Sequence, residues 1–138
     1  MNKELRDFLT QNKDLIIAAS FDSICKRKLN YYGNNEKEDT LHKLKSLLEV
    51  IVRCIENNEK SEIVAYIHAI SKERYKNGYI LFEIQTVINY IEENIWNLLQ
   101  QSSIGHKVEA LKLISSYLGV AKQQLASDFI KYSKKNPA

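Results

Sequence analysis

The chain has 138 residues, of which 44% are hydrophobic and 27% charged. This length and apolar content fit one domain, residues 1–138, with a polar tail at 133–138. An almost proline-free chain, whose single proline is Pro137, excludes a turn-rich sandwich or barrel. The net charge is +3, from 20 basic and 17 acidic residues of interspersed sign. We therefore expect no nucleic-acid and no membrane partner.

The longest apolar runs, residues 15–19 and 79–82, fall far short of the roughly 20 residues of a membrane span. The amino terminus lacks the apolar core of a signal peptide, and Cys25 and Cys54 do not make a disulfide framework. These features predict a cytoplasmic protein. Abundant lysine, isoleucine and asparagine are typical of an AT-rich genome and favour a bacterial source.

Helical spacing of apolar residues begins at Leu5 and continues to about Leu29. The polar residues 11–14 interrupt this spacing, which predicts a short helix and then a longer one. The polar segment 30–38 contains glycine and asparagine, and it is predicted to be the longest loop. An apolar stripe then predicts a helix over residues 40–57, with Asp39 or Thr40 as its amino-terminal cap.

A further stripe predicts a helix over residues 61–76, which ends because Asn77 and Gly78 both accept left-handed dihedral angles. The most regular stripe follows, with steps of three and four residues from Leu81 to Leu98. It predicts a long helix that residues 100–105 break.

The last predicted helix has an apolar stripe from Val108 to Tyr132, with Ser102 or Ser103 as its expected cap. Its length predicts that its carboxyl-terminal turns project beyond the other helices. The fold class is therefore all-α, with four long helices and a short amino-terminal one. They pack either as an antiparallel bundle or in a globin-like arrangement, and periodicity does not choose between these.

The sequence shows no clear catalytic or metal-binding motif. A di-iron bundle needs two Glu-x-x-His pairs, which are missing, and both cysteines lack the spacing of a zinc site or a nucleophile. We predict no enzyme, no metal and no cofactor. His68 is the histidine best placed to face the core, and it is either a boundary residue or, with Tyr66, part of a ligand or haem pocket.

Two basic clusters allow both a structural and a functional interpretation. Lys26, Arg27 and Lys28 with the tyrosines at 31 and 32 are of a kind that can hold single-stranded nucleic acid. We favour a solvated helix end, where basic residues complement the helix dipole. The same interpretation applies to the lysines at 131, 134 and 135.

Two stretches, SKERYKNGYILFEI at 71–84 and FLTQNKDLII at 8–17, carry a resemblance to a known family. They resemble the amino-terminal sensor domain of RsbR-type stressosome co-antagonists, the RsbRD-like helical domain that also precedes bacterial histidine kinases. The resemblance covers about residues 5–100. It implies a non-haem globin-like or helical-bundle sensor module of the stress response, without catalytic residues.

Arg74, Gly78 and Tyr79 lie in the first of these stretches and are predicted to form a structural turn. Gly78 lets the chain reverse, Tyr79 packs back across the junction, and Arg74 bonds the last carbonyls of its helix. Alternatively, Arg74 holds an acidic group on a neighbouring helix or subunit.

We therefore predict a non-catalytic bacterial signalling module that forms a homodimer. It transmits a signal through its last helix to a protein partner or an output domain. Trp96 and Tyr117 are the apolar positions expected to contribute to the dimer. The alternative is a small-ligand or haem-binding sensor or carrier that uses His68 and Tyr66.

Overall fold

A computed structural model describes residues 2–27, 29 and 37–135 of the chain. These residues form α-helices and no strands, which confirms the predicted all-α class. The helices are α1 (Asn2–Gln11), α2 (Lys13–Arg27), α3 (Lys37–Asn57), α4 (Ser61–Lys76), α5 (Leu81–Gln101) and α6 (Lys107–Lys135). None of the described helices combines the length and the apolarity that crossing a membrane requires.

The described residues form six helices, which match in order the short helix, the longer helix to about Leu29 and the four later helices that the apolar stripes predict. The summary count of four long helices and a short one is one too few. The difference lies in α2, which is a full element of 15 residues. Asn12 separates it from α1, and its side-chain Nδ2 donates to the carbonyl of Phe8 at 2.9 Å. The predicted end of this helix near Leu29 is slightly too late, because α2 ends at Arg27.

Two predicted caps are wrong. Asp39 and Thr40 lie inside α3, which begins at Lys37, and Thr40 is fully buried. Acidic residues in this first turn complement the helix dipole, so the helix extends further upstream. Ser102 closes α5 rather than opening α6, since its hydroxyl donates to the Leu99 carbonyl at 2.8 Å. The remainder of the predicted loop, residues 30–36, lies outside the described residues.

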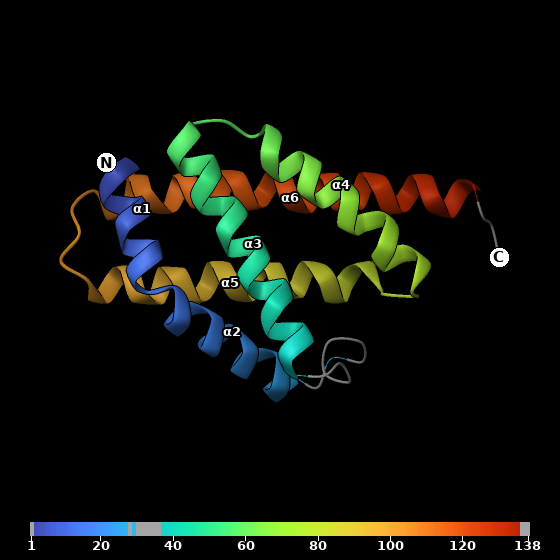
Figure 1. Cartoon of the computed structure of the whole chain (residues 1–138), viewed down its shortest axis with the longest axis horizontal. Helices are drawn as coiled ribbons and strands as arrows, with labels where there is room; N and C mark the ends of the chain where they lie inside the picture. Colours follow the sequence, from blue (N-terminus) through green and yellow to red (C-terminus); the bar gives the residue numbers. More distant parts are fainter. Residues whose placement is uncertain (1, 28, 30–36, 136–138) are drawn as a thin grey trace.

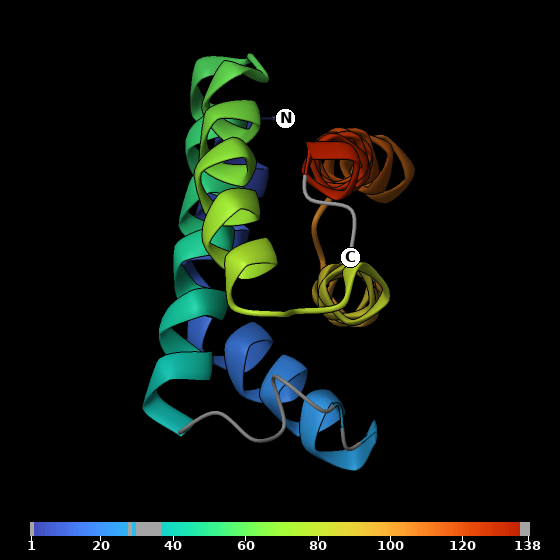
Figure 2. The ribbon, with the colours of Figure 1, turned by 90° about the vertical axis from the view of Figure 1, so that its right-hand side faces the viewer.

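The helices form two layers. Figure 1 shows α5 and α6 as a long antiparallel pair, and Figure 2 shows this pair nearly end-on. The other layer contains α1, α3 and α4, with α2 along its lower edge, where it contacts α5. The carboxyl-terminal turns of α6 extend past the end of α4 and the start of α5 (Figure 1), as the sequence predicted.

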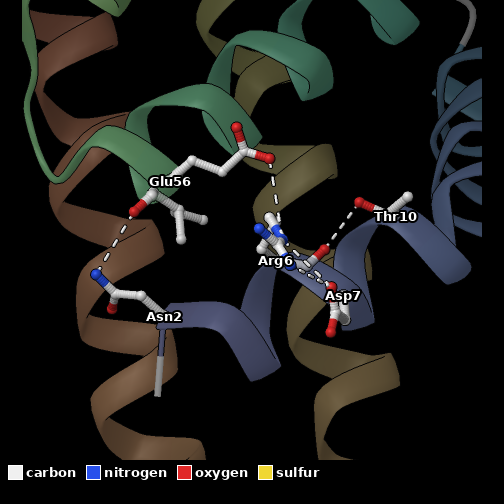
Figure 3. Close-up of polar contacts among 6 residues, drawn as sticks. Asn2, Arg6, Asp7, Thr10 and Glu56 are labelled. Atoms are coloured by element: carbon white, nitrogen blue, oxygen red, sulfur yellow. Dashed lines mark hydrogen bonds and ion pairs between the residues drawn. The ribbon is translucent and has the colours of Figure 1, made fainter.

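One hydrophobic core joins the two layers, and every described helix contributes buried side chains to it. Polar contacts fix α1 against the end of α3 (Figure 3). Asn2 Nδ2 lies 3.5 Å from the Ile55 carbonyl, and Arg6 Nε lies 3.9 Å from Glu56 Oε1. The amino-terminal helix is therefore part of the fold and not an appendage.

Candidate functional site: a cationic groove between α4 and α6

A groove lies between α4 and the carboxyl-terminal half of α6, the two described helices that pack most extensively against each other. Its volume is about 1020 Å³, which is at the upper end of the range of small-molecule sites. We call it the α4–α6 groove. Its lining residues are Ala65, His68, Ala69, Lys72, Tyr75 and Lys76 of α4, and Asp128, Lys131, Tyr132 and Lys135 of α6.

A buried carboxylate stands at one end of this groove. The side chain of Asp128 is 1% exposed, and its Oδ2 lies 2.9 Å from Nδ1 of His68, which is 58% exposed. Gln124 Nε2 donates to the other carboxylate oxygen at 2.9 Å. Burying a charged group is costly unless it is hydrogen-bonded, and here both oxygens have partners. The pair links α4 to α6 and fixes the orientation of the His68 ring.

Four lysines line the rest of the groove. Lys72 and Lys76 stand one helical turn apart on α4, and Lys131 and Lys135 stand one turn apart on α6. None of the four forms an ion pair within the described part of the chain. The groove therefore carries unneutralised positive charge in a chain whose overall charge is nearly balanced.

Aromatic rings form part of the groove wall. The rings of Tyr75 and Tyr132 have their centroids 5.4 Å apart with an interplanar angle of 47°. Tyr75 also meets Phe129 in an edge-to-face contact at 5.4 Å. Such contacts hold aromatic rings in defined orientations and contribute about 0.5–1.5 kcal/mol each beyond burial. The groove thus combines rigid aromatic surface with flexible cationic side chains.

The structure does not bring the two predicted ligand-binding residues together. His68 lines the α4–α6 groove, whereas Tyr66 lines a separate cavity near Lys43 and Arg74. That second cavity has a volume of about 20 Å³, room for roughly one water molecule. Burial raises the pKa of the Tyr66 hydroxyl. Positions 66 and 68 are about 200° apart around a helix, so their side chains leave α4 in different directions.

The turn after α4 has the geometry of a Schellman motif. Gly78 has a φ of 82°, its N–H donates to the Tyr75 carbonyl at 3.1 Å, and the Tyr79 N–H donates to the Arg74 carbonyl at 3.0 Å. The Tyr79 hydroxyl lies 2.7 Å from Lys43 Nζ. Arg74 is 4% exposed, with its guanidinium carbon 5.7 Å from the Tyr79 ring centre. These contacts join α3, α4 and the turn.

Trp96 and Tyr117 occupy different environments. Trp96 on α5 is partly buried against the core. Tyr117 on α6 is 3% exposed, and its hydroxyl donates to the Cys54 carbonyl at 3.1 Å. Tyr117 is therefore a core residue of the single chain and does not lie at the exposed position that a dimer contact requires. The position faces α3 because it continues the stripe of Ile114 and Leu118.

The remaining candidate residues do not assemble into a site. Cys25 is exposed on α2 and Cys54 is buried in α3, where burial raises the pKa of its thiol. Lys26 pairs with Asp22 one turn earlier, while Lys28 and the tyrosines at 31 and 32 lie outside the described residues. Within residues 2–27, 29 and 37–135, no group of three His, Cys, Asp or Glu side chains is placed to hold a metal ion.

Sequence reasoning did not single out Asp128, Lys72 or Lys76. A signal for Asp128 exists, because this carboxylate falls within the apolar stripe between Leu125 and Tyr132. The four-residue spacing of the lysines also places each pair on one helix face. The pairing of α4 with α6 is tertiary information, and no local pattern contains it.

Comparisons with protein-family models, with curated proteins and with solved structures gave no match. The resemblance to the RsbR-type sensor domain therefore stays a prediction.

Proposed function

We propose that the chain is a non-catalytic sensor or regulatory module of a bacterial signalling system, with the α4–α6 groove as its sensing site. A ligand in the groove shifts α6, and α6 passes the signal to a partner protein or output domain. The observation that carries this proposal is the double role of the last turns of α6. Lys131, Tyr132 and Lys135 line the groove, and the end of the same helix extends beyond the other helices (Figure 1).

The physical basis is a differential interaction of the ligand with two positions of α6. Cationic side chains on α4 and α6 repel one another across the groove, and an anionic ligand removes this repulsion. The His68–Asp128 pair stands at the inner end of the groove and serves as a fixed point. The turns beyond it respond to the ligand, as in known helix shifts of about 1–2 Å.

The shift is testable with spin labels before any ligand is identified. Labels at Ser133→Cys on α6 and Glu93→Cys on α5, in a Cys25→Ser background, report the position of the α6 end by double electron–electron resonance. The variant Lys72→Gln with Lys131→Gln mimics charge neutralisation, and we expect it to shift or narrow the distance distribution. Lys45→Gln with Lys112→Gln, both exposed outside the groove, is the matched control. Identical distributions in all three proteins would contradict the signalling role.

A homodimer is part of the proposal. Three exposed apolar side chains on the last two helices support it, namely Phe82 at 70%, Val108 at 57% and Ile130 at 54% exposure. Light scattering on a size-exclusion peak should give twice the chain mass of 16.0 kDa. Phe82→Ser should shift the mass toward the monomer, whereas Leu15→Ser, at an exposed leucine of α2, should not. A monomeric wild-type protein would remove dimerisation from the proposal.

The proposal includes a cytoplasmic location and retains both predicted helix arrangements. The antiparallel α5–α6 pair supports a bundle, and the oblique crossing of α3 and α4 over that pair supports a globin-like arrangement (Figure 1).

A haem or small-ligand carrier is the second candidate, and one observation favours it. The Nδ1 atom of His68 is engaged by a buried carboxylate, which is the arrangement that orients a metal-ligating histidine through its other nitrogen. Protein purified natively or reconstituted with haem would then show a Soret band that His68→Ala abolishes. His42→Ala, at an exposed histidine of α3, is the control. A colourless protein that does not take up haem would reject the haem carrier.

A further inference from the structure

The charged residues of the α4–α6 groove come from both of its walls. Helices α4 and α6 run in the same general direction (Figure 1), and His68 meets Asp128, 60 residues later in the chain. Lys131 follows Lys72 by 59 residues, and Lys135 follows Lys76 by the same interval. Each helix therefore carries two lysines at successive turns beyond its member of the His68–Asp128 pair. All six side chains line the same cavity.

This arrangement gathers four like charges in one groove. Asp128 is the single carboxylate among the lining residues, and its oxygens are already bonded by His68 and Gln124. Like charges gathered in one groove repel one another, and a bound anion reduces this repulsion.

The helix dipole explains half of this pattern. Lys76 and Lys135 are the last residues of their helices, where cations are favourable. Lys72 and Lys131 lie one turn further in, and the dipole effect falls off within the last turn. The inner lysine pair is therefore the part of the pattern that points to a ligand.

The shape of the groove restricts the ligand further. The lysines supply positive charge from both walls of the groove, which suits a ligand with two or more anionic groups. The rings of Tyr75 and Tyr132 offer aromatic surface beside these charges. The volume of about 1020 Å³ is that of a small-molecule site.

We infer that the ligand of the α4–α6 groove is a small molecule with two or more phosphate-type anionic groups, bound by the lysines of both walls, Lys72 and Lys76 on α4 and Lys131 and Lys135 on α6. The inference deepens the proposed function and rests on the groove being its sensing site. Lysine ammonium groups bind phosphate oxygens as point charges, through charge-assisted hydrogen bonds. A planar ring on the same ligand would stack on the tyrosine pair.

Isothermal titration calorimetry with inorganic pyrophosphate and with ADP tests the inference. We expect the wild-type chain to bind at least one probe, more weakly at higher salt. Lys72→Gln with Lys131→Gln should weaken binding at least tenfold, since two charge-assisted bonds are lost. Lys72→Arg with Lys131→Arg should retain binding, and Lys45→Gln with Lys112→Gln should bind like the wild type. Circular dichroism melting verifies that each variant is folded.

The possible results separate the two ideas. Equal affinity for both probes would support recognition of the phosphates alone, and tighter binding of ADP would support stacking on the tyrosines. If neither probe binds, or if the glutamine variant binds them as tightly as the wild type, the inference is overturned. Binding of an acidic peptide without binding of either small probe would also overturn it. If the spin-label distances change in the lysine variant but neither probe binds, only the ligand inference fails and the signalling role stands. If a probe binds but the spin-label distances do not change, the ligand inference stands and only the signalling role of α6 fails.

Discussion

Two buried tyrosines differ in whether their hydroxyl group is hydrogen-bonded. Tyr90 Oη is buried without a hydrogen-bond partner in the described part of the chain, whereas the Tyr117 hydroxyl donates to the Cys54 carbonyl at 3.1 Å. An unsatisfied buried polar group costs about 1–3 kcal/mol, and a typical hydrogen bond contributes about 0.5–1.5 kcal/mol.

Removing each hydroxyl should therefore change stability in opposite directions. We expect Tyr90→Phe to raise the free energy of unfolding by about 1 kcal/mol and Tyr117→Phe to lower it by about 1 kcal/mol. Urea unfolding at equilibrium measures both, and each variant is the control for the other. A loss of stability in Tyr90→Phe would mean that its hydroxyl is bonded after all.

At the scale of the helices, two glycines should respond oppositely to the same substitution. Gly78 closes α4 with a φ of 82°, a conformation that costs other residues about 1–2 kcal/mol. Gly119 lies inside α6, and a Cβ added there meets no atom within 4 Å. We expect Gly78→Ala to destabilise by about 1–2 kcal/mol and Gly119→Ala to stabilise by about 0.5–1 kcal/mol. Thermal melting of both variants checks these directions, because Tm should fall in Gly78→Ala and rise in Gly119→Ala. A change of Tm in the same direction in both variants would refute the argument.

The contact between α2 and α3 should depend on pH. Lys13 Nζ donates to Glu49 Oε1 at 2.9 Å, and this hydrogen bond lowers the pKa of Glu49 below its usual 4.5. A pKa lowered by folding contributes stability above the unfolded value that is lost as the pH falls through the folded value. Both side chains are partly exposed, so the contribution is limited to about 0–1 kcal/mol.

We therefore expect Glu49→Gln to lower stability slightly at neutral pH and to flatten the loss of stability below about pH 4.5. Glu93→Gln, at an exposed glutamate of α5, should leave the profile unchanged. Urea unfolding across the acid range measures the three profiles. If the stability of Glu49→Gln and of the wild type depended on pH in the same way, the Lys13–Glu49 ion pair would not contribute to the pH dependence.

The helices were predictable to the extent that their signals are local. The apolar stripe that begins at Leu81 predicts the start of α5, and Asn77-Gly78 predicts the end of α4, because periodicity and backbone freedom act within a few residues. The start of α3 was misplaced, because several residues near Lys37 can begin a helix and packing decides among them. Thr40 is fully buried in that helix.

The candidate site was less predictable than the helices. His68 was noticed as a histidine beside apolar residues, but its partner Asp128 lies on another helix and joins it only through packing. Tyr66 and His68 are predicted to line one pocket, but they line different cavities. The four lysines of the groove likewise come together only because α4 and α6 pack against each other.

At the scale of the whole molecule, the two layers depend on one another. The core is a single cluster that includes residues of all six described helices, and the layer of α1 contributes Leu5 and Leu9, both fully buried. Trp96 on α5 packs against the same cluster from the other layer. The single tryptophan of the chain therefore reports on one layer while circular dichroism reports on all helices.

This arrangement predicts that the domain unfolds cooperatively. A destabilising substitution in α1 should therefore shift the unfolding transition of the whole domain. Leu5→Ala should cost about 2–5 kcal/mol, because it leaves a cavity at a fully buried position. The urea transitions seen by Trp96 fluorescence and by circular dichroism should move together, since a small domain unfolds in one step. Leu15→Ala, at a leucine that is 59% exposed on α2, should shift neither transition by more than about 0.5 kcal/mol. If Leu5→Ala moved the circular dichroism transition and left the Trp96 transition in place, α1 would unfold independently of the layer that contains α5.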